Sequence, residues 1–313
     1  MASGAAHHHM LAVLSSEIAA SGRRSVRILD AGCGNGELIL HLRERMADLH
    51  PGLNLEIFGF DVSDSAVQEA GYIGEALELL RERAPGVAWG ERIRVVTSRD
   101  PWPFPADHFD YVISNHVLEH VADHDLFLSE TRRVLKEGGT SIHLFPLSHN
   151  LYEGHLRMPP VHWFKEFDML RAAILWASRL GWGSYREANQ GGLATSRQAF
   201  AESRADFLLF ETNYLSRGAV LALAKRHRMR CSFRYTEHFY TNRLRTLIGR
   251  PPRTSLRPSR HAFLHGVLVF FLMWCSSITV LMEKKSLQVA AKPLIADGEA
   301  EGRLTSAASN PQA

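Results

Sequence analysis

The sequence predicts an α/β fold in which helices cover both faces of a parallel sheet. Short apolar runs alternate with amphipathic stretches between residues 26 and 145, and two of these runs end at an acidic residue beside a turn. Such alternation predicts parallel pairing, because each crossover helix returns the chain to the same edge of the sheet. The 313 residues, 45% of them hydrophobic and 22% charged, are enough for a substantial core.

The expected elements follow from apolar periodicity and from the residues that end each run. Strands are predicted at Val26–Leu29, Leu55–Phe60, Ile93–Thr97, Phe109–Ser114 and Thr140–Phe145, and helices at Glu37–Leu49, Glu75–Arg83 and Asp125–Lys136. Gly138 and Gly139 are expected to end the last helix. A parallel sheet of this kind binds its ligands at the carboxyl ends of the strands.

A glycine-rich turn follows the first predicted strand. It reads Asp30-Ala31-Gly32-Cys33-Gly34-Asn35-Gly36, and glycine permits positive φ and close approach of the backbone to a ligand. Asp61 ends the next strand, about 25–30 residues further on, where a carboxylate can bind both hydroxyls of a ribose. Together these features predict a site for a nucleoside-containing cofactor.

Three further motifs follow in order. They are PWPFPADHFDYVIS at residues 101–114, NHVLEHV at 115–121 and RRVLKEGG at 132–139. With the glycine turn they make Val26–Phe145 resemble the class I S-adenosylmethionine (SAM)-dependent methyltransferases, in particular their small-molecule "type 11" members. The resemblance implies an α/β fold with a Rossmann-like SAM methyltransferase sheet and a mostly helical C-terminal extension. It implies an enzyme whose cofactor is S-adenosyl-L-methionine.

The resemblance also assigns cofactor contacts to individual residues. They are Asp30, Gly32, Gly34 and Gly36 around the methionine part, Asp61 at the ribose hydroxyls, Val62 beside the adenine, Arg99 and Asp100 near the adenine amine, and Asn115 and His116 under the sulfonium. The sequence departs from the family pattern in a long insert, residues 71–89, before the third strand.

His116, Glu119 and His120 form a second constellation. On a helical turn their spacing places them on one face, and their side chains are of the types that ligate divalent metals. Similar Glu-x-x-Glu-His motifs occur in ubiquinone-pathway O-methyltransferases and in small-RNA 3′-end methyltransferases, but here the first position is His. The favoured interpretation is a common superfamily motif with His120 hydrogen-bonded near the pocket, so no metal is expected and the triad is kept as the alternative.

Histidines gather again after the fifth strand. Residues 153–155 and 159–163 are the best candidates for a lid over the acceptor, and histidine suits this place because its pKa of about 6.5 lets it take a proton from a hydroxyl near neutral pH. The candidate catalytic residues are His116, His120, His155 and His162.

The predicted activity is O-methylation of a saccharide, a lipid-linked saccharide or a small hydroxylated metabolite. N- or C-methylation of a small molecule, RNA methylation and SAM binding without turnover remain alternatives. A formal charge of only +3 does not favour nucleic acid as a partner.

Four regions are expected along the chain. Residues 1–22 form a flexible N-terminus, and its three histidines at 7–9 are interpreted as a disordered or appended tract rather than a metal site. Residues 23–148 form the SAM-binding domain, 149–290 a substrate cover and C-terminal extension with a hydrophobic helix, and 291–313 a disordered polar tail. No signal peptide is recognised.

An apolar stretch, Leu264–Met282, lies between Arg260 and the pair Lys284-Lys285, and an arginine-rich segment precedes it. The stretch nearly reaches the roughly 20 residues that span a bilayer. A spanning helix, a buried core helix containing Phe270 and Trp274, and peripheral attachment of residues 261–285 to an anionic membrane all remain open. The three scattered cysteines favour a reducing, cytoplasmic setting, at the inner face of the membrane if the membrane interpretation holds.

Overall fold

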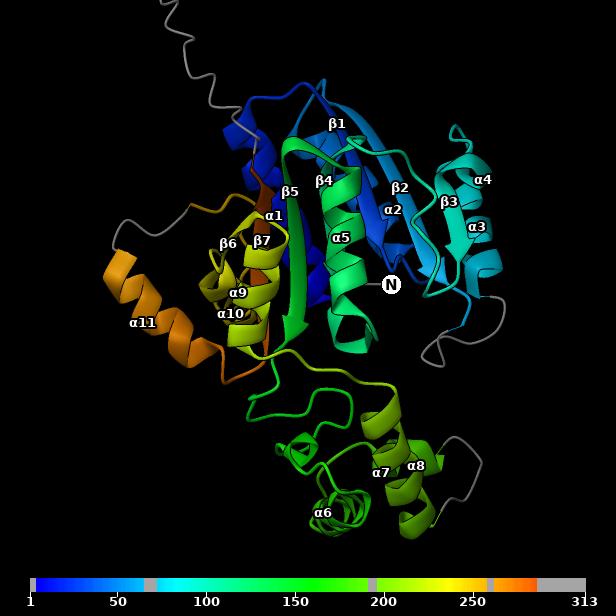
Figure 1. Ribbon diagram of the computed structural model, residues 1–313, viewed down its shortest axis with the longest axis vertical. Helices are drawn as coiled ribbons and strands as arrows, with labels where there is room; N and C mark the ends of the chain where they lie inside the picture. The colour runs from blue at the N-terminus through cyan, green and yellow to red at the C-terminus, as the bar shows by residue number, and fades with distance from the viewer. Residues whose placement is uncertain (1–3, 65–71, 191–195, 258–261, 286–313) are drawn as a thin grey trace, which may run out of the picture.

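The computed structural model describes residues 4–64, 72–190, 196–257 and 262–285 (Figure 1). Its centre is a seven-stranded sheet in the order β3-β2-β1-β4-β5-β7-β6. The strands are β1 Ser25–Ala31, β2 Asn54–Val62, β3 Ile93–Val96, β4 Phe109–Asn115, β5 Leu135–Pro146, β6 Met229–Ser232 and β7 Ser277–Lys284. The first five pair in parallel, as expected, whereas β7 runs antiparallel to both β5 and β6.

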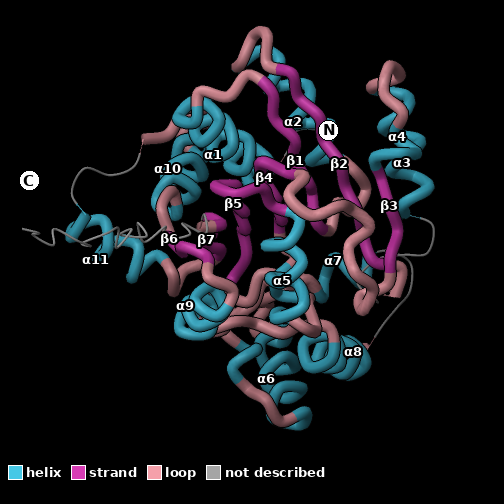
Figure 2. The backbone as a smooth tube through the Cα atoms, turned by 45° about the horizontal axis from the view of Figure 1, so that its top comes forward, coloured by secondary structure: helices cyan, strands magenta, loops and turns pink. Residues whose placement is uncertain are grey.

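Helices cover both faces of this sheet (Figure 2). The buried side chains of α1 (Ala5–Ser21), α2 (Glu37–Leu49) and α10 (Thr236–Leu247) belong to one apolar cluster, and those of α5 (His124–Val134) and α9 (Arg217–Arg226) to another. Two short helices, α3 (Tyr72–Arg83) and α4 (Trp89–Arg92), precede β3. The Rossmann-like arrangement predicted for the methyltransferase sheet is therefore confirmed.

The expected boundary between α5 and β5 is wrong. The helix ends at Val134, and Gly138 and Gly139 lie inside β5, which begins at Leu135. Pairing between β4 and β5 is irregular at this point, between Phe109 and Tyr111. A Cβ on Gly139 would lie 2.8 Å from the carbonyl oxygen of Lys136, so the irregular strand requires glycine here.

The N-terminus is helical, and the expectation of a flexible 1–22 segment is wrong. Helix α1 buries residues 9–16 almost continuously, and Nε2 of His9 lies 2.7 Å from Oγ1 of Thr279 in β7. Burial lowers the pKa of His9 to about 3, so its ring stays neutral inside the fold. The expectation of a disordered or appended histidine tract is therefore wrong for His9, which packs against the sheet.

The C-terminal extension divides into two parts. Residues 147–216 leave the sheet at the end of β5 and form the cover, with α6 (Phe167–Arg179), α7 (Tyr185–Gln190) and α8 (Arg197–Phe210), below the sheet in Figure 1. The chain then returns, and β6 and β7 complete the sheet. The described part of the extension over 149–290 is mostly helical, as expected, and it also supplies β6 and β7, which were not expected. The tail at 291–313 lies outside the described residues.

The apolar stretch Leu264–Met282 is not one helix. Its first part forms α11 (Ala262–Leu272), and its last part is β7, buried between two strands. Phe270 is 53% exposed and Trp274 36%, so a buried helix containing them is wrong. None of the helices in the described part of the chain has the length and apolar character needed to cross a bilayer.

Candidate active site

A cleft of about 410 Å³ opens at the carboxyl ends of the parallel strands. It is lined by the turn after β1, by the ends of β2 and β4, and by residues 210–213 at the C-terminal end of α8 and just after it. This is the edge at which open α/β sheets bind ligands, because the loops there diverge around the switch in strand order.

The glycine turn forms the wall of the cleft. Gly32, Gly34 and Gly36 all have positive φ, at 79°, 52° and 77°. A Cβ on Gly32 would lie only 2.5 Å from Cγ2 of Val117, so no larger residue fits without moving the turn. The turn therefore presents bare backbone to the cleft, as close binding of a ligand requires.

Asp30 carries the clearest signal that the cleft binds a cation. The residue is 1% exposed, and neither carboxylate oxygen has a hydrogen-bond partner within the described structure. Burial raises the pKa of Asp30 well above its usual range, and the nearby Asp61 raises it further. A buried carboxylate is stable in its charged form only beside a cation or a donor, and the α-ammonium and sulfonium of SAM supply positive charge.

Asp61 lies at the end of β2 and is held by the backbone. Its carboxylate accepts hydrogen bonds from the amides of Gly34, at 2.6 Å, and Val62, at 2.8 Å. Burial raises the pKa of Asp61, although these two bonds oppose the shift. The carboxylate lines the cleft next to the glycine turn, which is the position expected for a ribose ligand.

Most of the residues assigned to the cofactor line this cleft. Those that do are Asp30, Gly32, Gly34, Asp61, Val62, Asp100, Asn115 and His116. Gly36 instead precedes the first turn of α2, where its positive φ starts the helix. Arg99 is exposed and is not among the residues that line the cleft.

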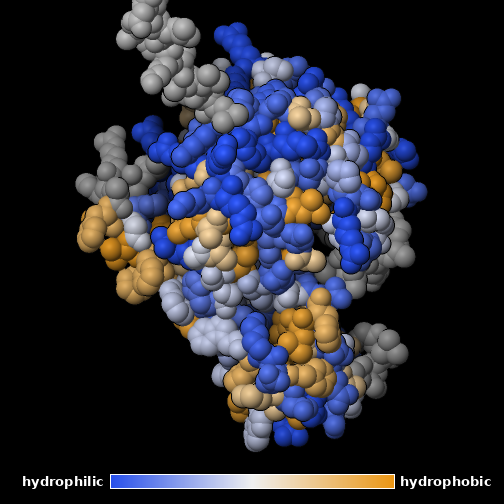
Figure 3. All heavy atoms as spheres, in the orientation of Figure 1, coloured by the Kyte–Doolittle hydropathy of each residue, from blue (hydrophilic) through white to orange (hydrophobic). Residues whose placement is uncertain are grey.

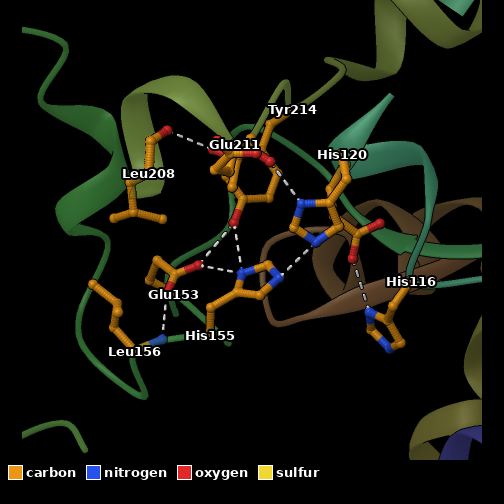
Figure 4. A network of polar contacts seen from close by, with 10 residues as sticks. His116, His120, Glu153, His155, Leu156, Leu208, Glu211 and Tyr214 are labelled. Carbon is orange, nitrogen blue, oxygen red and sulfur yellow. Dashed lines mark hydrogen bonds and ion pairs between the residues drawn. The ribbon is translucent and has the colours of Figure 1, made fainter. Parts of the chain in front are cut away.

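At the other end of the cleft, a polar network joins three distant segments (Figure 4). Nε2 of His120, which lines the cleft, lies 3.2 Å from Nε2 of His155. Nδ1 of His155 contacts Glu153, and the hydroxyl of Tyr214 donates to the same carboxylate at 2.7 Å. Burial opposes protonation of His155, but the bond to Glu153 and its charge outweigh this and raise the pKa. His155 thus contacts His120, which lines the cleft, although His155 is not itself among the lining residues.

The other candidate histidines occupy different positions. His116 lines the cleft with positive φ, and its Nδ1 lies 3.0 Å from Oε1 of the buried Glu119. His162 is 4% exposed behind Tyr214, with ring centroids 5.2 Å apart, and burial lowers its pKa to about 4. The ring of His162 is therefore placed to support Tyr214 rather than to meet a ligand in the cleft.

Sequence reasoning missed several residues of the site. His7, on α1, lines the cleft, as do Trp102 and Asn213, and Tyr214 holds the acceptor-side network. The histidine tract could have pointed to His7 had the apolar residues after it been read as a helix. No local pattern marks Tyr214, because its role depends on contacts with residues 61 positions away.

Known proteins place this chain in a family. Residues 6–202 match the family model described as "Methyltransferase domain". The ubiquinone biosynthesis O-methyltransferase of Mesorhizobium japonicum is 30% identical over 115 residues, covering 36% of this chain and 38% of that one. The ajmaline N-methyltransferase of Rauvolfia serpentina is 27% identical over 133 residues, covering 42% and 40%. The chain thus spans about two fifths of the length of these relatives.

Solved structures also match this chain, at low sequence identity. The YcgJ protein of Bacillus subtilis matches with a TM-score of 0.46 and 17% identity, over 89% of this chain and 99% of that one. The family match covers more than half of the chain, and the orphan carboxylate of Asp30 and the bare turn at Gly32 fit a cationic, nucleoside-bearing cofactor. The chain therefore belongs to the methyltransferase domain family, and the cofactor that its cleft fits is S-adenosylmethionine.

Proposed function

We propose that this protein transfers a methyl group from SAM to a hydroxyl of a saccharide, a lipid-linked saccharide or another small hydroxylated molecule. The observation that carries the proposal is the contact of His155 with His120, which lines the cofactor cleft. A hydroxyl must lose its proton to become a good nucleophile, and imidazole is suited to assist this near neutral pH. An amine needs less help in losing a proton, so the presence of the two histidines favours oxygen over nitrogen as the acceptor atom.

The chain's own residues position and activate the acceptor. Bound SAM supplies a methyl group that its sulfonium already activates, so the protein's main task is to align the acceptor with it. The acceptor oxygen gives up its proton at the histidine pair, forms a bond to the methyl carbon, and the carbon–sulfur bond breaks. Residues 210–213 and the cover exclude water from the reacting atoms.

The test is methyl transfer from isotopically labelled SAM to the aqueous and lipid fractions of a cell extract. Label in a methyl ether of a small molecule, reduced at least about tenfold in His120→Gln, is the expected result. Label in RNA or on an amine would contradict the proposal, and binding of SAM without any transfer would favour a non-catalytic protein. His227→Gln is the matched control, because His227 lies at the C-terminal end of α9 with its Nε2 3.0 Å from Oδ1 of Asp125.

We also propose that helix α11 attaches the enzyme to an anionic membrane surface. Six of its apolar side chains are between 41% and 81% exposed, namely Phe263, Leu264, Val267, Leu268, Phe270 and Phe271. Val269 and Met273 face the core, so α11 presents its remaining surface to solvent (Figure 3). A contiguous apolar surface of this size is characteristic of an interaction site.

Charge complementarity favours a lipid surface over an apolar protein partner. On α10 and the loop after it, the same stretch of chain that carries exposed Leu247 and Ile248 holds five arginines, and none of them makes an ion pair with a carboxylate in the described residues; they are Arg243, Arg245, Arg250, Arg253 and Arg257. Each arginine near an anionic surface contributes about 1 kcal/mol. The three free cysteines support placing this contact at the cytoplasmic face.

Sedimentation with vesicles tests this attachment. The protein should sediment with phosphatidylglycerol-containing vesicles at low salt and be released by high salt, while vesicles of phosphatidylcholine alone should retain less. Phe270→Asp combined with Phe271→Asp should abolish sedimentation, and Val95→Asp on the exposed edge strand β3 should not. Equal sedimentation of the wild type and the double variant would contradict the proposal.

A further inference from the structure

We infer that Glu119, His120 and His155 form a binding site for a divalent transition-metal ion at the acceptor end of the cleft. One ligand atom from each of the three residues lies within 4.8 Å of the other two, in the part of the chain that the structure describes. The inference of a site depends on these contacts alone, and the role of the ion rests on the proposed O-methyl transfer.

The hydrogen-bond partners of the two rings fix where their protons lie. Nδ1 of His120 is 2.7 Å from the carbonyl oxygen of Glu211, which can only accept, so this nitrogen carries the proton. Nδ1 of His155 is 2.9 Å from the carboxylate of Glu153 and donates in the same way. In the neutral rings, both Nε2 atoms therefore hold lone pairs, and they face each other at 3.2 Å (Figure 4). Two lone pairs at this distance repel unless a positive charge lies between them.

The separation of the two nitrogens suits a metal ion. Two imidazoles on a tetrahedral zinc ion, with bonds of about 2.0–2.1 Å, have their nitrogens roughly 3.3 Å apart. The observed 3.2 Å is close to this value. A single proton shared by the two Nε2 atoms would also bring the rings together. The surroundings of Glu119 distinguish a metal ion from a shared proton.

Glu119 supplies the second, independent observation. Its side chain is fully buried, with Oε1 bonded to His116 and Oε2 without a partner in the described structure. A buried carboxylate oxygen without a donor is unfavourable, and a cation beside the histidine pair would satisfy it. Two histidines and one glutamate with an open position form the ligand set of catalytic zinc sites. Imidazole nitrogens favour such transition metals over Mg²⁺.

The surrounding contacts resemble those that orient metal ligands. Glu153 holds the ring of His155, and is itself held by the hydroxyl of Tyr214 and by the amide of Leu156 at 2.6 Å. A carboxylate behind a ligating histidine fixes its orientation and increases its basicity. The ligand set also differs from the His116–Glu119–His120 alternative, since His155 from the cover takes the place of His116.

At the open position the ion would bind the acceptor through its hydroxyl oxygen. Coordination lowers the pKa of a bound hydroxyl, so the proton leaves to solvent and the oxygen attacks the methyl carbon while the carbon–sulfur bond breaks. The ion would then take over the activation that the neutral histidine pair otherwise provides.

Metal titration in the absence of SAM and acceptor tests the site. The chelator-treated protein is titrated with Zn²⁺ by calorimetry and with Co²⁺ by visible absorption. We expect one ion per chain and the absorption of four- or five-coordinate Co²⁺. Affinity should fall at least about tenfold in His155→Gln, and about 10- to 100-fold in Glu153→Gln, which removes the charge behind the ring.

His149→Gln is the matched control, because His149 lies on the same segment but stacks on Trp274, with ring centroids 4.7 Å apart. SAM binding and melting temperature confirm that each variant is folded. No binding of either ion, or equal binding by the His155 and His149 variants, would overturn the site. If methyl transfer then persists in chelator, the proposed function stands with the histidines as the base; if metal binds but no hydroxyl is methylated, only the proposed function fails.

Discussion

The two ends of the cleft are built in different ways. The glycine turn and the two carboxylates proposed to hold the cofactor come from one continuous stretch, residues 30–62, in which strand, turn and strand bring Asp30 and Asp61 together. The proposed acceptor end joins side chains from three segments of the chain, namely His120, Glu153, His155 and Tyr214. Local chain geometry thus fixes the first end, and the second forms only when the cover folds against the sheet.

This difference implies that the two ends can be changed separately. Substitutions in residues 30–62 should alter SAM affinity, whereas substitutions in the network should alter methyl transfer and the stability of the cover.

Asp61→Ala should have the largest effect. A charge-assisted hydrogen bond contributes about 1.5–3 kcal/mol, so losing one to each ribose hydroxyl should weaken SAM binding at least about a hundredfold. Isothermal calorimetry measures this directly. Asp48→Ala, on the exposed side of α2, is the control and should bind SAM like the wild type. Wild-type affinity in Asp61→Ala would remove this residue from the ribose site.

Asp30→Asn should weaken SAM binding by about tenfold while making the free protein more stable. The amide keeps the shape of the side chain but removes the buried charge, for which the described residues offer no hydrogen-bond partner. Calorimetry and thermal melting should therefore shift in opposite directions. Unchanged affinity with unchanged melting temperature would show that Asp30 plays no electrostatic part in binding.

The pH dependence of SAM binding should follow from the same carboxyl. Burial raises the pKa of Asp30, so the neutral acid persists to higher pH than usual, and a proton must leave when the cationic cofactor binds. Affinity should therefore fall as pH decreases through this raised pKa, by at most about tenfold per pH unit for one proton. Calorimetry in buffers of different ionisation enthalpy should detect the released proton. The dependence of SAM affinity on pH should become weaker in Asp30→Asn. An unchanged dependence would show that another group releases the proton.

Tyr214→Phe should leave SAM affinity unchanged within about twofold. Burial raises the pKa of Tyr214 above its usual range, so its hydroxyl stays protonated and donates to the buried Glu153. Losing a hydrogen bond to a charged group should lower the free energy of unfolding by about 1–3 kcal/mol and slow methyl transfer. Denaturant unfolding and turnover assays measure both. A large loss of SAM affinity instead would show that the two ends are coupled.

Short-range patterns were enough to predict the glycine turn, the position of Asp61 and the five parallel strands. Glycines at Gly32 and Gly34 are required by backbone geometry within one turn, and Asp61 follows from the length of one βα unit. Alternating apolar runs predict strands wherever both faces of the sheet are covered.

The packing of α1, the structure of residues 264–282 and the contact between His120 and His155 could not be predicted in this way, because each depends on residues far away in the chain. Helix α1 packs on the sheet through long-range contacts, such as that of His9 with Thr279 in β7, 270 positions away in the sequence. The apolar stretch at 264–282 is divided between an exposed helix and a buried strand, because its last part pairs with the edge of β5 that β4 does not occupy. The pairing of His120 with His155 arises only when the chain folds back after β5, and no spacing in the sequence encodes that contact.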